Sequence, residues 1–199
     1  MSDAGVPAPA ELPPNSPKLP DHAGRRLCRA LLRVSGWRLV GPVPDVRKLV
    51  LIAAPHSSWW DGIWGLLMKI GIGLDVAFMG KRELFRGPLG WLLRRLGGIP
   101  ITRHSARGVV EQMVDNFHAT DTLWLGIAPE GTRRQVAEWK TGFWHIAQQA
   151  AVPVFPVAFH YPDKAIHLGP LFTLSDDMAA DLARLRNFYA PFQGKHHDV

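Results

Sequence analysis

Short apolar runs alternate with segments of helical periodicity along most of the chain. The runs at 48–53 and 122–128 are almost wholly apolar, which is typical of strands buried on both faces of a sheet. Shorter runs at 75–79 and 99–103 are also predicted to be strands. The stretch 152–159 is expected to be extended as well, and its prolines indicate an edge strand or an irregular one.

Helices are predicted between these strands, where apolar residues recur every third or fourth position. They cover 25–35, 60–70, 88–96 and 142–150, together with a segment opened by Ser105 and another capped by Ser175, Asp176 and Asp177. Ser57 or Ser58 supplies the N-cap of the helix at 60–70. Strands that alternate with helices predict an α/β fold, in which a mostly parallel central sheet carries helices on both faces.

The chain is expected to form one domain between two less ordered ends. Its 199 residues are enough for a proper core, and we assign the domain to 24–192, after a proline-rich, disordered stretch 1–23 and before a flexible tail 193–199. The single cysteine, Cys28, excludes an intrachain disulfide and a cysteine-based metal site, and it favours a reducing compartment. No apolar segment reaches the roughly 20 residues that a membrane span needs, so any membrane contact is expected to be peripheral.

Positive charge is concentrated in the segment 81–110. It carries seven basic residues and a single acidic residue, Glu83. The resulting charge of +6 equals the formal net charge of the whole chain. This favours an anionic partner, namely nucleic acid, lipid head groups or a phosphorylated substrate, although a solvated basic face is also consistent. The helix at 25–35 sets arginines beside Leu27, Leu31 and Val34. It either lies on an anionic bilayer or caps the core with its leucines inside.

Polar residues follow directly after the strand at 48–53, in the sequence APHSSWWDG. Ligands of parallel sheets lie beyond the carboxyl ends of the strands, and His56, Arg103 and Glu130 each follow such an end. With His56 in the loop and Asp61 in the first helical turn, the carboxylate can fix the imidazole tautomer and leave the other nitrogen as a base. A loop histidine satisfied by a helix-capping aspartate explains the same spacing.

A second strand-end loop, APEGTRR at 128–134, combines a glycine with two adjacent arginines. The arginine fork suits phosphate, and Glu130 beside the arginines is interpreted as an ion-paired positioning residue. Together, the His-x4-Asp block and the Glu-Gly-Thr-Arg block resemble the glycerolipid acyltransferase family, typified by bacterial 1-acylglycerol-3-phosphate acyltransferase. The segments 80–103, 139–143 and 152–157 are similar to the other blocks of that family, in the same order.

The resemblance implies the fold and the chemistry of an acyltransferase. His56 would be the general base that takes the proton of an acceptor hydroxyl, and Asp61 would orient it, without a covalent acyl-enzyme or a metal. The acyl donor would be acyl-CoA or acyl carrier protein, with no further cofactor, and the acceptor a lysophospholipid such as 1-acylglycerol 3-phosphate. The acceptor site would comprise Arg103, Glu130, Gly131, Thr132, Arg133 and Lys140. Lys81 and Arg82 would contact the carrier or the membrane.

This resemblance also implies a place in phospholipid biosynthesis, in the cytoplasm at the inner face of the membrane, with no nucleic-acid partner. Two features depart from the family pattern. Trp59 and Trp60 are bulkier than the residues usual in the first block, and the N-terminal region is shorter than the anchoring segment of many relatives. Two alternatives stay open: a non-catalytic lipid-binding protein, which would not need His56, and an acyltransferase that acts on a lyso-aminolipid.

Overall fold

One sheet forms the centre of the molecule. The computed structural model describes residues 12–21, 23–102 and 108–199. Within these ranges, strands pair in the order β1-β7-β6-β2-β5-β3-β4, and every neighbouring pair is parallel except β6 with β7. The strands are β1 (Arg38–Val40), β2 (Lys48–Ala54), β3 (Ala77–Lys81), β4 (Gly98–Ile101), β5 (Leu123–Ile127), β6 (Val154–His160) and β7 (Ala165–Leu168). The predicted α/β fold with a mostly parallel sheet is confirmed.

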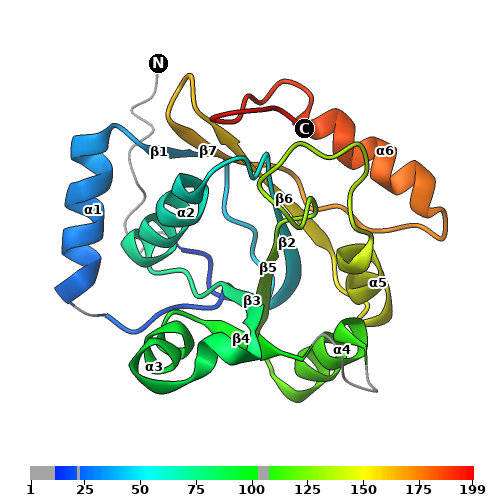
Figure 1. Cartoon of the computed structure of the whole chain (residues 1–199), viewed down its shortest axis with the longest axis horizontal. Coiled ribbons are helices and arrows are strands. Elements are labelled where there is room, and N and C mark those ends of the chain that lie inside the picture. Colours follow the sequence, from blue (N-terminus) through cyan, green and yellow to red (C-terminus); the bar gives the residue numbers. More distant parts are fainter. Residues whose placement is uncertain (1–11, 22, 103–107) are drawn as a thin grey trace.

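Helices cover both faces of this sheet, as Figure 1 shows. The helices are α1 (Ala23–Ser35), α2 (Trp59–Ile72), α3 (Gly87–Arg95), α4 (Val109–Ala119), α5 (Gly142–Gln149) and α6 (Met178–Tyr189), with a short 3₁₀ helix, η2 (Arg82–Phe85). Buried side chains of α1 and α2 join the core on one face, and those of α4, α5 and α6 join the core on the other. None of the described helices is both long and apolar enough to cross a bilayer.

The central strand β2 belongs to both cores. Leu49 packs in the core under α1 and α2, while Val50 and Ile52 pack in the core under α4, α5 and α6. Because successive side chains of a strand point to opposite faces, a strand covered on both sides must be apolar throughout. This explains the continuous apolar run that marked the strand in the sequence.

The proline-containing strand β6 was predicted to be either an edge strand or an irregular one, and the edge position is wrong. It pairs with β2 on one side and with β7 on the other. The prolines are tolerated because Pro153 precedes the strand and Pro156 lies just before the antiparallel pairing with β7, which begins at Val157. The hydroxyl of Tyr189 also bridges here, since it accepts from the Val157 N–H and donates to the Ile52 carbonyl oxygen.

Three further details differ from the sequence-based expectations. The short strands β1 and β7 were not predicted. The helix expected to open at Ser105 begins at Val109, with Gly108 as its N-cap, and Ser105 itself lies outside the described residues. Part of the stretch expected to be disordered packs on the domain: the Leu19 N–H donates to the Gly73 carbonyl oxygen, and Leu12 is buried. The domain limits themselves stay a prediction.

Candidate active site

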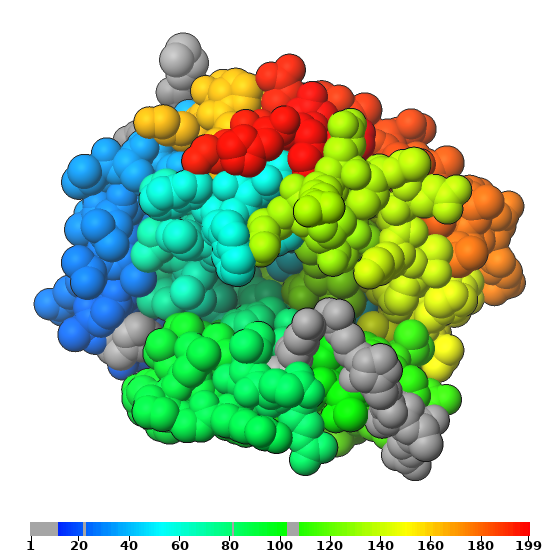
Figure 2. All heavy atoms as spheres, in the orientation of Figure 1, coloured from blue at the N-terminus to red at the C-terminus, as the bar shows by residue number. Residues whose placement is uncertain are grey.

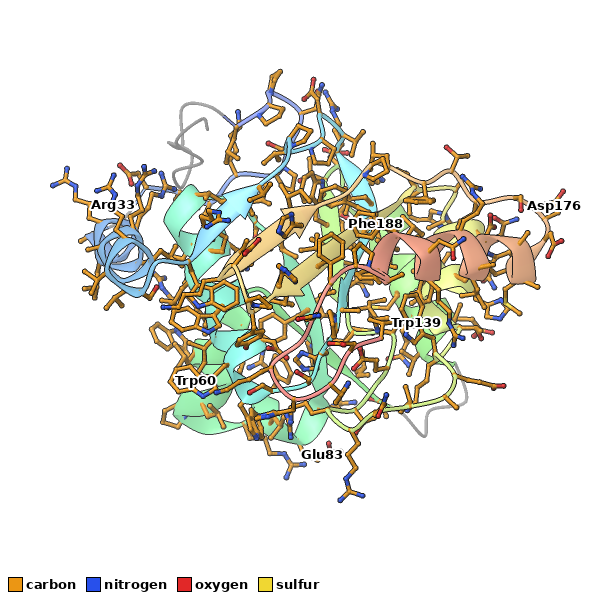
Figure 3. The ribbon with its side chains drawn as sticks, turned by 90° about the horizontal axis from the view of Figure 1, so that it is seen from above. Arg33, Trp60, Glu83, Trp139, Asp176 and Phe188 are labelled. Carbon is orange, nitrogen blue, oxygen red and sulfur yellow. The ribbon has the colours of Figure 1, made fainter. Side chains whose placement is uncertain are left out.

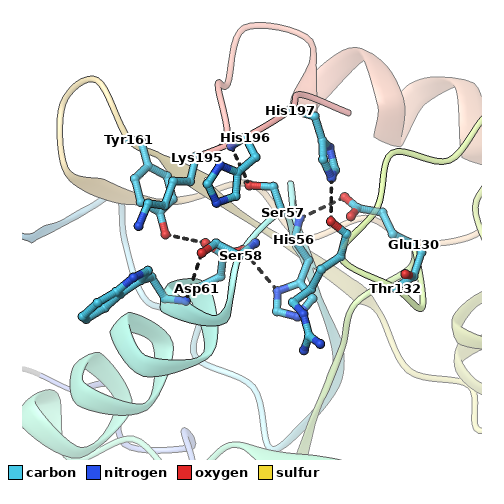
Figure 4. Close-up of polar contacts among 12 residues, drawn as sticks. His56, Ser57, Ser58, Asp61, Glu130, Thr132, Tyr161, Lys195, His196 and His197 are labelled. Atoms are coloured by element: carbon cyan, nitrogen blue, oxygen red, sulfur yellow. Dashed lines mark hydrogen bonds and ion pairs between the residues drawn. The ribbon is translucent and has the colours of Figure 1, made fainter.

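The loops after three adjacent strands meet at one edge of the sheet. His56 follows β2, Glu130 follows β5, and Tyr161 follows β6, and these strands are neighbours in the order β6-β2-β5. Figure 4 shows the three side chains around the start of α2, where Asp61 lies. Of the three strand-end residues expected to converge, His56 and Glu130 lie together, whereas Arg103 lies outside the described residues.

Asp61 serves both as a helix cap and as the partner of His56. Ser58 is the N-cap of α2, and its backbone N–H donates to Asp61 Oδ2 at 2.7 Å in a capping box. The same oxygen lies 3.4 Å from His56 Nδ1. Asp61 is wholly buried. The two interpretations of the sequence were thus compatible, because the cap fixes the carboxylate in the place where it faces the imidazole.

The imidazole of His56 is held in its neutral form at neutral pH. Its pKa is lowered from the ordinary value, chiefly because burial penalises the imidazolium; Asp61 raises this pKa, and Arg133 and His197 lower it. A neutral imidazole whose Nδ1 faces a carboxylate can accept a proton at Nε2. The geometry therefore suits a general base.

We expect the NMR titration midpoint of the His56 imidazole to lie below the ordinary pKa of about 6.5. The Arg133→Gln variant is expected to move it to higher pH, because a positive charge that disfavours the imidazolium has been removed. Arg134→Gln, a change of the same kind at the adjacent residue, serves as the control. A midpoint above 6.5 in the native protein would contradict the assignment of His56 as a base that is free at neutral pH.

Glu130 supports the loop that carries His56, instead of pairing with an arginine. Its Oε1 accepts a hydrogen bond from the His56 backbone N–H at 2.9 Å. Among the described residues no ion pair joins Glu130 to Arg133 or Arg134, so the expected ion pair is wrong. The side chain is buried and its Oε2 has no hydrogen-bond partner. Burial raises the pKa of this carboxyl group above its ordinary value.

The remaining residues of the Glu-Gly-Thr-Arg loop lie at the surface beside His56. Gly131 has a positive φ of 65°, which favours glycine, and a Cβ there would lie 2.8 Å from Lys140 Cδ. The Arg133 guanidinium lies over the ring of Trp59, with Cζ 3.6 Å from its centroid. Thr132 is exposed. The loop thus brings the guanidinium of Arg133 close enough to lower the pKa of His56, and it places the Lys140 side chain beside Gly131.

Lys81 and Arg82 lie on a different part of the sheet. Lys81 ends β3, and Arg82 is exposed at the start of η2. The side chain of Lys81 lies outside what the structure describes. No contact between the described atoms joins Arg82 to His56 or Asp61. Within the described residues, Arg82 therefore does not contact the cluster around the imidazole.

The segment 193–199 lies over the His56 loop, although it was expected to be flexible. The backbone N–H groups of Lys195 and His196 donate to Ser57 Oγ at 2.9 and 3.2 Å. His197 Nε2 lies 3.1 Å from the Arg133 carbonyl oxygen. Figure 2 shows this segment, in red, passing above α2. It encloses one side of the site.

An apolar cavity of about 490 Å³ extends from His56 along α2. Asp61 in the first turn of the helix and Ile72 in its last turn both line it, and the apolar side chains of Leu51, Phe78, Phe155 and Phe159 supply part of the wall. Figure 2 shows the surface hollowed between the segments of α2 and of β3 to α3. The polar His56 and Asp61 thus stand beside a long hydrophobic space.

In the ranges 12–21, 23–102 and 108–199, no three His, Cys, Asp or Glu side chains come close enough together to hold a metal ion. Of the residues that contact the site, sequence analysis missed Tyr161 and the segment 194–197. Tyr161 follows the carboxyl end of a predicted strand, so the rule that pointed to His56 and Glu130 could have found it.

Fold and site together define an α/β protein with a His-Asp pair beside an apolar cavity. Residues 39–160 match the model of the Acyltransferase family, and because this match covers more than half of the chain, the chain belongs to that family. It is 34% identical over 101 residues to 1-acyl-sn-glycerol-3-phosphate acyltransferase of Escherichia coli (strain K12), a match that covers 47% of this chain and 40% of that protein. This chain thus matches about two-fifths of its relative's length.

A solved structure supports the fold. The 1-acyl-sn-glycerophosphate acyltransferase from Thermotoga maritima resembles this chain with a TM-score of 0.59 at 17% sequence identity. The likeness covers 82% of this chain and 74% of that one. At this identity the comparison establishes a common fold. The resemblance inferred from the sequence blocks is confirmed at the level of the family.

Proposed function

We propose that this protein transfers a fatty acyl group from a thioester, acyl-CoA or acyl carrier protein, to a hydroxyl of a lysophospholipid such as 1-acylglycerol 3-phosphate. One observation carries the proposal: His56, neutral and backed by buried Asp61, lines an apolar cavity that follows α2 from its first turn to its last. A non-catalytic lipid-binding protein would need the cavity but not the base. Both the family match and the relative from Escherichia coli support the catalytic alternative.

In the proposed reaction His56 takes the proton of the acceptor hydroxyl as its oxygen attacks the thioester carbonyl carbon. A new C–O bond forms and a tetrahedral intermediate results. The C–S bond then breaks, and the thiolate leaves with the proton that the imidazolium returns. Asp61 stabilises the imidazolium while it exists and keeps the other nitrogen directed at the acceptor. The acyl group passes directly between substrates, so no covalent acyl-enzyme is needed.

The acceptor head group is proposed to bind at the loop after β5. Arg133 and Lys140 supply charge for its phosphate, Arg103 adds a further cation, and Thr132 adds a hydroxyl. Glu130 contributes indirectly, since its carboxylate holds the His56 backbone. Gly131 leaves room for the Lys140 side chain. Lys81 and Arg82 stay candidates for contact with the carrier or the membrane.

A panel of acceptors tests this assignment. With palmitoyl-CoA as donor, the initial rate of acyl transfer is measured for 1-acylglycerol 3-phosphate, glycerol 3-phosphate and a lyso-aminolipid, and repeated with acyl carrier protein. We expect 1-acylglycerol 3-phosphate to give the highest kcat/KM, and Arg133→Gln to raise its KM. A preference for the lyso-aminolipid that survives Arg133→Gln would contradict the phosphate site.

The cavity is proposed to hold the acyl chain. Between Asp61 and Ile72 the helix rises about 16 Å, which suits an extended long acyl chain. Gly65 lines the cavity one turn beyond Asp61, and a Cβ there meets Phe159 at an ordinary distance of 3.5 Å. Gly65→Met is therefore expected to fill the path and to raise the KM for palmitoyl-CoA roughly tenfold, on the scale of lost apolar burial, while butyryl-CoA is little affected.

The matched control for that variant is Ala179→Met, because Ala179 is exposed on α6, far from the cavity. Steady-state kinetics with acyl-CoA of four to eighteen carbons measures the change. An equal rise in KM for short and long acyl donors in Gly65→Met would contradict the proposal that the acyl chain lies along α2.

Peripheral membrane contact is proposed on the side of α1, α2 and α3. The stripe of α1 that was expected either on a bilayer or inside the core points outward: Leu27, Leu31 and Val34 are 63%, 45% and 89% exposed. The buried face of α1 is formed by Arg25, Cys28 and Leu32 instead. The interpretation of α1 as a cap with this stripe inside is therefore wrong.

Further exposed apolar residues continue this surface. They are Trp59, Trp60 and Ile63 on α2, with Leu84, Leu89, Trp91 and Leu92 on η2 and α3. Exposed arginines accompany them on α1, η2 and α3. Arg33 and Trp60 both project on the left-hand side of Figure 3. Apolar side chains beside arginines suit an interface with anionic lipid.

The double variant Leu31→Glu/Val34→Glu is expected to bind vesicles containing anionic phosphatidylglycerol at least tenfold more weakly, because two apolar contacts become like-charged with the lipid. Co-sedimentation measures the binding. Leu171→Glu, at an exposed apolar residue after β7, is the control. Equal binding by the double variant and the native protein would remove α1 from the proposed surface.

A further inference from the structure

The hydroxyl groups of both tyrosines of this chain donate hydrogen bonds to other groups of the protein. Tyr189 links β2 to β6 through backbone groups. Tyr161, which follows β6, instead donates a hydrogen bond to Asp61 Oδ1 at 2.5 Å. The close-up in Figure 4 shows Tyr161 on the opposite side of Asp61 from His56. The family match ends at residue 160, so Tyr161 lies one residue beyond it.

Both oxygens of the buried Asp61 carboxylate are engaged. Oδ2 accepts from the Ser58 N–H and faces His56 Nδ1, while Oδ1 accepts from the Tyr161 hydroxyl. A carboxylate can rotate about its Cβ–Cγ bond, and a donor on Oδ1 opposes that rotation. The Ser58 N–H fixes one oxygen and leaves the plane of the carboxylate free to turn about it. The hydroxyl of Tyr161 holds the second oxygen and thereby fixes that plane.

The ring of Tyr161 is itself held in place. It packs edge to face on Trp37 with centroids 5.1 Å apart, and Trp37 in turn stacks on Trp64 of α2 at 5.1 Å. The pKa of the Tyr161 hydroxyl is raised above its ordinary value, first by burial and then by its hydrogen bond to Asp61. The hydroxyl therefore keeps its proton and remains a donor at neutral pH.

We propose that Tyr161 is a positioning residue for acyl transfer, because its hydroxyl fixes the Asp61 carboxylate in the orientation in which Oδ2 faces His56. This inference rests on the proposed function. Tyr161 touches neither substrate in the reaction as written; it acts through Asp61. By donating to the carboxylate it also disperses part of the negative charge that would otherwise favour the imidazolium.

The charged groups that face His56 come from several elements. Asp61 lies on α2, Arg133 lies in the loop after β5, and His197 lies in the segment over the site. Glu130 bonds the His56 backbone. Of these groups, Asp61 is the one that the Tyr161 hydroxyl contacts, so a change in the His56 titration in Tyr161→Phe reports on the carboxylate of Asp61.

The test compares Tyr161→Phe with Tyr189→Phe, which removes the hydroxyl of the other tyrosine and leaves the contacts of the His-Asp pair in place. For Tyr161→Phe we expect kcat to fall by roughly 10- to 100-fold, as for a misplaced catalytic group, with the KM of donor and acceptor unchanged. The acid limb of its pH–kcat profile should move to higher pH, since the undispersed carboxylate favours the imidazolium. Tyr189→Phe should lower the unfolding temperature without moving that limb.

A second readout keeps this inference separate from the proposed function. The NMR titration of the His56 imidazole is followed in the native protein and in both variants, and it needs no turnover. An upward shift confined to Tyr161→Phe supports the coupling even if every acyl donor fails. An unshifted midpoint in Tyr161→Phe, or the same shift in Tyr189→Phe, would overturn the positioning role, since a merely structural hydroxyl predicts either result.

Discussion

Replacing His56 with glutamine is expected to lower kcat for acyl transfer by about 10² to 10⁴, the usual contribution of a general base. Glutamine can still accept a hydrogen bond, but it cannot take up the proton of the acceptor hydroxyl. The effect on kcat is expected to be large because the His56 imidazole both faces a buried carboxylate and lines the cavity. Thiol release from palmitoyl-CoA in the presence of 1-acylglycerol 3-phosphate measures the rate.

His118→Gln is the matched control for that variant, since His118 is exposed at the end of α4. Circular dichroism establishes that both variants are folded. If His56→Gln kept a rate within a few-fold of the native protein, His56 would not be the base, and lipid binding without catalysis would become the better account.

Replacing Asp61 is expected to have the second-largest effect on kcat. Two variants separate its role in catalysis from its role in stabilising the start of α2. Asp61→Asn keeps the size of the side chain and an acceptor for the Ser58 N–H, but a neutral amide cannot stabilise an imidazolium, so we expect kcat to fall by about 10² or more. Asp61→Ala also removes the cap and leaves the buried Ser58 N–H and Tyr161 hydroxyl without their acceptor. Its free energy of unfolding should fall by about 2–4 kcal/mol.

Urea unfolding monitored by circular dichroism separates these effects from those on kcat. The account requires Asp61→Asn to be much less destabilised than Asp61→Ala while both lose most of their activity. An Asp61→Asn variant with native kcat would mean that the aspartate only caps α2, which is the simpler interpretation of its sequence spacing.

Local sequence was sufficient for the parts of the site that lie close together in the chain. The apolar runs predicted β2 and β5, and Ser57 or Ser58 as N-cap predicted the start of α2, with Asp61 in its first turn near His56. These features depend on continuous apolar runs and on helix-capping residues, and both signals lie within a few residues of the sequence.

The features that sequence could not supply depend on distant partners. Strands β1 and β7 are too short to carry a pattern, and β6 is internal only because β7 returns antiparallel beside it. The orientation of α1 could not be predicted, because the sequence of a short amphipathic helix does not determine which of its faces packs on the protein. The bond from Tyr161 to Asp61 joins residues 100 positions apart, and no local rule could rank it above other contacts.

Acceptor-dependent transfer tests the central claim most directly. Palmitoyl-CoA is incubated with the protein, with and without 1-acylglycerol 3-phosphate, and free CoA and acylated lipid are quantified in the same samples by mass spectrometry, with His56→Gln alongside. The account predicts equal amounts of CoA and acylated lipid, formed only when the acceptor is present and lost in the variant. CoA released equally without acceptor, or lipid bound but never acylated from either acyl-CoA or acyl carrier protein, would contradict it.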